Sequence, residues 1–158
     1  MEKEVFYLTK GKLKELRAEY ERLVATEHHK AIEEEAPKML ESEDMNPEFA
    51  SFQDEMGALR GRIDELKNIL DNHQIIKNPP KERQVMVSVG ANVTLEAGGK
   101  HDKFMIVGTL ESDPDLGRIS NESPMGKALL GKKIGEEVLV STPARKKYKI
   151  KSISYEVS

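Results

Sequence analysis

The stretch NPEFASFQDEMGALRGRIDELKNILD, residues 46–71, decides how this chain folds. Its apolar residues recur at alternating steps of three and four, the heptad pattern of a helix that packs along one line. Asn46 is a suitable cap, and Pro47 suits the first helical position. We therefore expect a helix over residues 47–71, about 38 Å long, with a packing face of Phe49, Phe52, Met56, Leu59, Ile63, Leu66 and Leu70.

A second helical pattern precedes it, over about residues 9–43. Pro37 interrupts this segment and predicts a kink or a helix end, because proline removes a hydrogen bond. A face this narrow needs a partner, and the short link between the segments predicts an antiparallel helical hairpin. The expected face is Leu13, Leu16, Tyr20 and Leu23, resumed in a shifted phase by Ile32, Ala36, Met39 and Leu40.

The net charge of −3 is unevenly distributed. Residues 33–48 contain seven acidic residues and one lysine, so this short stretch alone has a net charge of −6. It falls between the two helical patterns, and we expect it at the tip of the hairpin.

Composition excludes several classes of protein. Charged residues make up 34% of the 158 residues and aromatic residues 5%, which favours long solvated helices over a large core. The absence of cysteine excludes disulfides and thiolate sites. No apolar run approaches the roughly 20 residues that span a bilayer, and the charged start does not resemble a signal peptide. We expect no membrane partner and a cytoplasmic location.

The second half has strand patterns. We expect strands over 85–89, at 93–95, over 103–110, 137–141 and 146–155, with a turn at 97–100 and a bulge near Lys151 and Ser152. A short helix over 125–130 should begin after Ser123-Pro124 and end at Gly131. The predicted fold is α+β: a hairpin over 1–77, a proline-containing linker over 78–82, and a small, mostly antiparallel sheet domain over 83–158.

These features resemble the Gre family of bacterial transcription elongation factors over nearly the whole chain. The closest parts are SPMGKALLG, residues 123–131, and KIGEEV, residues 133–138, which are similar to the family's C-terminal signature. LTKG at 8–11, VGANV at 89–93, and Gly61-Arg62-Ile63 followed by Leu66 resemble three further parts. The resemblance implies a coiled-coil N-terminal domain and an FKBP-like C-terminal domain, without prolyl isomerase activity.

The resemblance also implies a partner and an activity. Gre factors enter the secondary channel of bacterial RNA polymerase, where carboxylates at the tip help the polymerase to cleave backtracked RNA. The partner would be the polymerase, with the 3′ end of the transcript reached indirectly. The chain would not be an enzyme and would hold no cofactor or stable metal of its own, acting on Mg²⁺ bound by the polymerase. Contact near the channel mouth would involve Ser123, Pro124, Met125, Gly126 and Lys127.

The tip differs from the family's Asp-Leu-x-Glu-Asn-Ala-Glu-Tyr pattern. The corresponding stretch here is Glu43-Asp44-Met45-Asn46-Pro47-Glu48-Phe49. One alignment to the family pattern leaves two of its residues without a match. The other alignment has no gap but places Ser42 and Met45 at the acidic positions. Either alignment leaves one acid without a counterpart. The candidate residues that assist the polymerase Mg²⁺ are Asp44, supported by Glu43, Glu41 or Glu48.

Two other functions stay open. A channel-binding factor could inhibit or modulate the polymerase without stimulating cleavage, and a coiled-coil scaffold would need no polymerase. Lys147, Lys149 and Lys151 alternate on an expected strand, as either a basic patch for nucleic acid or polymerase or a solvent face. Ser123 is most simply a helix cap.

Overall fold

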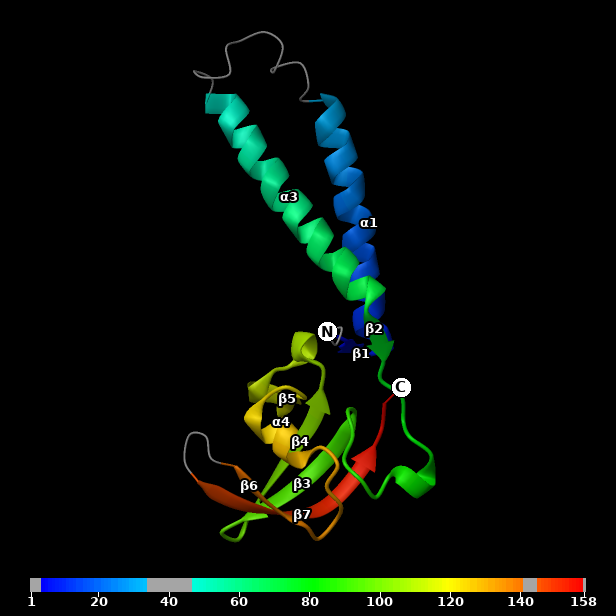
Figure 1. Cartoon of the computed structure of the whole chain (residues 1–158), viewed down its shortest axis with the longest axis vertical. Helices are drawn as coiled ribbons and strands as arrows, with labels where there is room; N and C mark the ends of the chain where they lie inside the picture. Colours follow the sequence, from blue (N-terminus) through cyan, green and yellow to red (C-terminus); the bar gives the residue numbers. More distant parts are fainter. Residues whose placement is uncertain (1–3, 34–46, 141–144, 158) are drawn as a thin grey trace. The chain divides into compact units, whose positions relative to one another are not determined.

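A computed structural model of the chain describes residues 4–33, 47–140 and 145–157. The chain forms two compact units, Leu13–Asn72 on the one hand and Met1–Lys12 with His73–Ser158 on the other. The first is a helical hairpin and the second a sheet with a short helix (Figure 1). The predicted α+β class, a hairpin followed by an FKBP-like antiparallel sheet, is confirmed. The predicted domain limits, 1–77 and 83–158, stay a prediction about independently folding parts.

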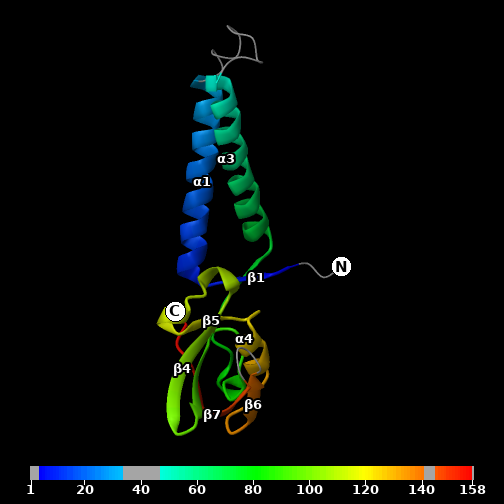
Figure 2. The same cartoon turned by 90° about the vertical axis from the view of Figure 1, so that its left-hand side faces the viewer.

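The hairpin consists of α1, Lys10–Glu33, and α3, Pro47–Asp71, which lie side by side (Figure 2). They run antiparallel, because Glu19 of α1 pairs with Arg62 of α3 whereas the later Lys30 pairs with the earlier Glu55. The predicted helix over 47–71 is confirmed. The predicted kink at Pro37 lies outside the described residues. No helix in the described part of the chain is long and apolar enough to cross a bilayer.

The packing face of α3 follows most of the predicted pattern, but Phe49 and Leu59 are only half-buried and the end of the helix differs. The heptad residues Phe52, Met56, Ile63 and Leu66 are buried, but Ile69 is buried in place of Leu70. An α-helix turns by about 100° per residue, so the burial of Ile69 means that the buried line leaves the predicted face at this last position. On α1, Leu16 is buried, whereas Ile32, expected on the resumed face, is 61% exposed.

A charged pair joins the two helices beside this apolar line. The Arg62 guanidinium donates from Nε and Nη2 to the two carboxylate oxygens of Glu19, at 2.8 and 3.0 Å. Its Nη1 lies 3.1 Å from Glu65 Oε2, one turn along α3. The pKa of Arg62 is raised above its ordinary value, chiefly because Glu19 accepts its hydrogen bonds. This forked geometry holds the helices in one register.

We expect Arg62→Lys to lower the free energy of unfolding of the hairpin by about 1 kcal/mol, because lysine cannot form the two-pronged bond. Urea denaturation followed by helical circular dichroism measures the change. The matched control is Arg60→Lys, since Arg60 Nε lies 3.8 Å from Glu27 and the side chain is 61% exposed. An equal loss in both variants would contradict a special role for Arg62.

The larger sheet has five strands in the order β5-β4-β3-β7-β6. Its pairs are antiparallel except for β4 with β5, which is parallel, so the predicted mostly antiparallel sheet is confirmed. A separate parallel pair joins β1 and β2. The strands are β1 Phe6–Leu8, β2 His73–Ile75, β3 Ala91–Ala97, β4 Lys100–Val107, β5 Arg118–Ser120, β6 Glu137–Val140 and β7 Lys146–Tyr155.

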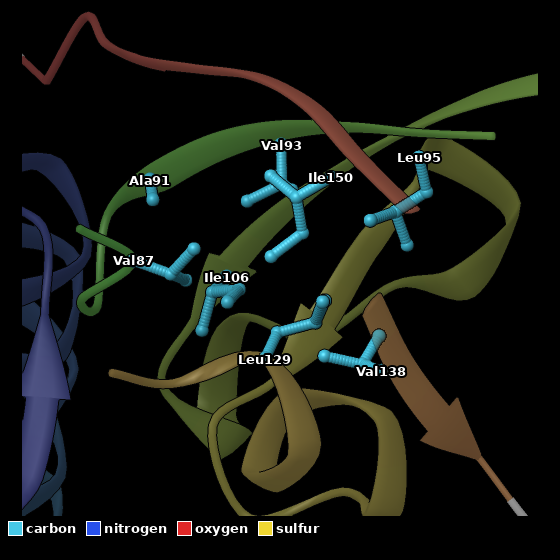
Figure 3. Close-up of a cluster of buried hydrophobic side chains, with 8 residues drawn as sticks. All are labelled: Val87, Ala91, Val93, Leu95, Ile106, Leu129, Val138 and Ile150. Atoms are coloured by element: carbon cyan, nitrogen blue, oxygen red, sulfur yellow. The ribbon is translucent and has the colours of Figure 1, made fainter. Parts of the chain in front are cut away.

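The core of this unit lies between one face of the sheet and α4, Pro124–Leu129. Figure 3 shows side chains from β3, β4, β6 and β7 pointing toward Leu129 of the helix. Leu129 is fully buried, as are Leu95, Ile106 and Ile150 on three neighbouring strands. The cluster comprises Val87, Ala91, Val93, Leu95, Ile106, Leu129, Val138 and Ile150.

Two predicted details of the sheet are confirmed and one is wrong. The register of β3 with β7 shifts between Thr94 and Leu95, which leaves Lys151 as the extra residue of the expected bulge. The turn at 97–100 uses Gly98 and Gly99, both with positive φ. The predicted strand over 85–89 is not formed: the 3-10 helix η2, Lys81–Arg83, precedes an isolated bridge at Met86.

Val87 explains that error. Its N–H donates to the Lys132 carbonyl and its carbonyl accepts from the Gly131 N–H, both at 2.8 Å, so its hydrogen bonds go to a loop. The side chain nevertheless enters the core, with 2% exposure. Val85 is 51% exposed and Val89 only half-buried, so the alternation of valines marked neither a sheet strand nor a continuous buried face.

Candidate functional site

The acidic residues expected at the tip are only partly described. Glu41, Glu43 and Asp44 lie outside the described residues. Glu48 lies in the first turn of α3, after Pro47, and is exposed. The grouping of these four carboxylates stays a prediction.

The described end of the hairpin also carries acidic side chains. An open groove of about 300 Å³ is lined by Pro47, Glu48, Ser51, Phe52 and Glu55. Glu55 accepts a 2.9 Å hydrogen bond from Lys30, which ties the groove to α1. Within the described ranges no three potential metal ligands lie together in a way that could hold an ion. The described residues thus provide acidic oxygen atoms without a metal site of their own.

The stretch Ser123–Lys127 begins α4, and its serine is a helix cap, as the simplest interpretation predicted. The Ser123 hydroxyl accepts a 3.0 Å hydrogen bond from the Gly126 N–H and donates one of 2.7 Å to the Ser120 carbonyl. Pro124 occupies the start of the helix, where its missing N–H has no cost. Ser123 is therefore committed to local structure.

Gly126 has an equally local role. It is buried, and a Cβ at this position would overlap the carbonyl oxygen of Ser120 and approach the Ser123 hydroxyl within 3.1 Å. Only glycine allows α4 to pack this closely on the chain before it. The helix then places Leu129, with 0% exposure, in the core.

The remaining residues of the stretch differ in access. Pro124 and Lys127 are exposed, whereas Met125 is half-buried and packs against the core cluster. The five residues expected to contact a partner thus comprise a structural pair, Ser123 and Gly126, the half-buried Met125, and two exposed residues, Pro124 and Lys127. Whether any of them binds a partner stays a prediction.

We expect Gly126→Ala to destabilise the sheet unit by about 1–3 kcal/mol, because the methyl group has no space beside the Ser120 carbonyl. Thermal unfolding followed in the near-ultraviolet measures the loss. Gly61→Ala in α3 is the control, since a Cβ there meets nothing within 4 Å and alanine favours helix. If both variants were equally stable, the close packing of α4 would not require glycine.

The lysines of β7 form part of a mixed surface. Lys147 and Lys149 are exposed and pair in register with Leu139 and Glu137 of β6. Lys151, in the bulge, donates to Glu96 at 2.7 Å. That bond is the largest cause of a lowered pKa at Glu96. Since acids lie beside two of these lysines, the solvent-face interpretation accounts for the alternation.

Sequence reasoning did not single out Glu111. Both of its carboxylate oxygens accept hydrogen bonds from Thr9, which lies 102 residues earlier and precedes α1. A glutamate after a strand has no spacing or motif that would indicate such a partner. The only available signal was Thr9 itself, within the quoted stretch LTKG.

Comparison with known families gives matches over both units. The description "Transcription elongation factor, N-terminal" (GreA/GreB) matches residues 6–75, and "Transcription elongation factor, GreA/GreB, C-term" matches residues 82–155. The description "Prefoldin subunit" matches residues 45–109. The first two together cover the described hairpin and the five-stranded sheet.

Individual relatives agree with the first two descriptions. Transcription elongation factor GreA of Thermomicrobium roseum is 36% identical over 146 residues, 90% of this chain and 92% of the relative. GreA of Bacillus cytotoxicus is 43% identical over 100 residues, 62% of this chain and 63% of the relative. The solved structure of GreA factor homolog 1 of Thermus thermophilus is 25% identical, covering 96% of this chain and 99% of that one, with a TM-score of 0.43.

Proposed function

Because the chain belongs to the GreA/GreB family of transcription elongation factors, we propose that it inserts its acidic hairpin tip into the secondary channel of RNA polymerase. There it stimulates cleavage of backtracked RNA by the polymerase. The observation that carries this proposal is an antiparallel hairpin with arms of 24 and 25 residues, interrupted by the stretch 33–48 with a net charge of −6. The site of action is the cytoplasm, where the polymerase transcribes.

The length of the hairpin supports insertion. Each arm rises about 36 Å, since an α-helix rises 1.5 Å per residue. Only one apolar line is buried between the helices, so the pair stays two helices wide over its described length. A hairpin of this width could bring its charged tip into a channel that is too narrow for a globular domain.

The carboxylates would act through magnesium. Hydrolysis of a phosphodiester by two metal ions needs one cation on the attacking water and one on the leaving oxygen. Magnesium accepts one or two carboxylates alongside waters and phosphates. Asp44, with Glu43, Glu41 or Glu48, would complete the binding of a second ion by the polymerase. The polymerase would do the chemistry, and this chain would not be the enzyme.

Charge also selects the partner. A net negative tip is attracted by a channel lined with basic residues and repelled by free nucleic acid, whose phosphates are negative. We therefore place the polymerase, and not the transcript, as the primary binding partner.

We expect the chain to accelerate transcript cleavage in a stalled elongation complex, and Asp44→Asn to reduce that acceleration about tenfold or more, because the amide is a poor magnesium ligand. The amount of released RNA 3′ fragment on a gel, followed over time, gives the rate. Glu43→Gln and Glu48→Gln serve as matched charge controls with smaller effects. Loss in Glu43→Gln with Asp44→Asn intact would mean that Glu43 is the main acid.

A second function is favoured by the tip sequence. The stretch 43–49 aligns with two residues missing relative to the cleavage factors, or with Ser42 and Met45 at the acidic positions, so at least one carboxylate lacks a counterpart. A factor that occupies the channel with one acid fewer would block or modulate synthesis without cleavage. The same stalled complex separates the two functions: inhibition of RNA extension without new 3′ fragments identifies the second.

Docking is expected to use the exposed part of the stretch Ser123–Lys127. We expect Lys127→Glu to raise the concentration for half-maximal effect on the polymerase about tenfold, because an exposed cation at an interface aids encounter and fit. Competition with a known channel-binding factor measures the change. The control, Lys132→Glu, reverses another exposed charge beyond α4. Equal effects of the two variants would argue against a specific contact at Lys127.

A further inference from the structure

The carboxylate of Glu111 binds Thr9, the residue directly before α1. Thr9 donates to it twice, from its backbone N–H at 2.8 Å and from its hydroxyl at 2.6 Å. The same hydroxyl oxygen accepts from the Lys12 N–H at 3.2 Å, so Thr9 caps the helix while Glu111 binds the cap. Hydrogen bonds to an ionised acceptor are stronger than neutral ones, and a negative charge is favourable at a helix N-terminus.

Glu111 belongs to the 3-10 turn η3, Thr109–Glu111, which also faces the chain before α4. The Thr109 hydroxyl lies 2.7 Å from the Ser120 hydroxyl and donates to Glu122 at 3.1 Å. Ser120 in turn accepts, through its carbonyl, the hydroxyl of the α4 cap Ser123. One short turn therefore connects the cap of α1 to the cap of α4.

The backbone of β1, which leads into α1, is closely packed against its neighbours. A Cβ at Gly108, directly before η3, would overlap the Tyr7 carbonyl oxygen of β1. β1 is also held by β2, since the Ile76 N–H donates to the Leu8 carbonyl at 2.9 Å. The strand that leads into Thr9 is thus enclosed between β2 and η3.

We propose that Glu111 is a positioning residue, which fixes the first turn of α1 in the same hydrogen-bonded frame as the stretch Ser123–Lys127. The inference rests on the proposed function for its purpose, since the first turn of α1 leads into the hairpin that would act on the polymerase. The carboxylate supplies that connection because its two oxygens match the two donors of Thr9.

The test compares Glu111→Gln with Glu82→Gln, an exposed glutamate of η2 that undergoes the same chemical change. Glutamine offers one acceptor oxygen where Thr9 needs two. Amide hydrogen exchange at Thr9 and Lys12 should rise about tenfold in Glu111→Gln and stay unchanged in Glu82→Gln. Unchanged exchange at Val93 in the core shows that the unit is folded. Thr9→Ser, which keeps the hydroxyl, should behave as the wild type.

The polymerase assay gives the second measurement. In Glu111→Gln the concentration for half-maximal effect should stay within about twofold, while the maximal rate of cleavage, or the maximal inhibition if the chain inhibits, falls at least about fivefold. Wild-type exchange at Thr9 and Lys12 would overturn the inference, as would an unchanged maximal effect. A wild-type chain without any effect on the polymerase would overturn the proposed function, and hydrogen exchange would then decide the role of Glu111 by itself.

Discussion

The hairpin depends on an apolar contact only one line of side chains wide. That line consists of Leu16 on α1 and, on α3, of Phe52, Met56, Ile63, Leu66 and Ile69. Such a contact buries little surface. Charged pairs at the margin, above all Arg62 with Glu19, therefore matter more here than on a broad interface, because they fix the register that the apolar line alone would allow to slip.

The stretch Ser123–Lys127 combines residues that local packing requires with residues that stay at the surface. Ser123 and Gly126 are needed for the close approach of α4 to Ser120, whereas Pro124 and Lys127 remain at the surface. A pattern shared with a family can thus reflect a packing constraint as much as a binding role. Separating the two requires the geometry of each side chain, which a resemblance alone does not provide.

Local patterns predicted the parts of the fold that local physics determines. The helix over 47–71, the Gly98-Gly99 turn and the bulge at Lys151 each follow from spacing or residue type within a few positions. β1, β2 and β5 were missed because three residues cannot display an alternation. The pairing of Thr9 with Glu111 was equally hidden, since it joins residues 102 positions apart. Of the candidate acids, the structure describes only Glu48.

Because β1 pairs with β2, residues 9–72 form a segment whose two ends lie on neighbouring strands. Phe6 faces His73 and Leu8 faces Ile75, so the chain returns beside the place it left. Insertion or deletion of seven residues in both arms would change the reach by about 10 Å and leave that closure intact. The length of the hairpin can therefore vary between related chains without a change in the strand pair from which it leaves and to which it returns.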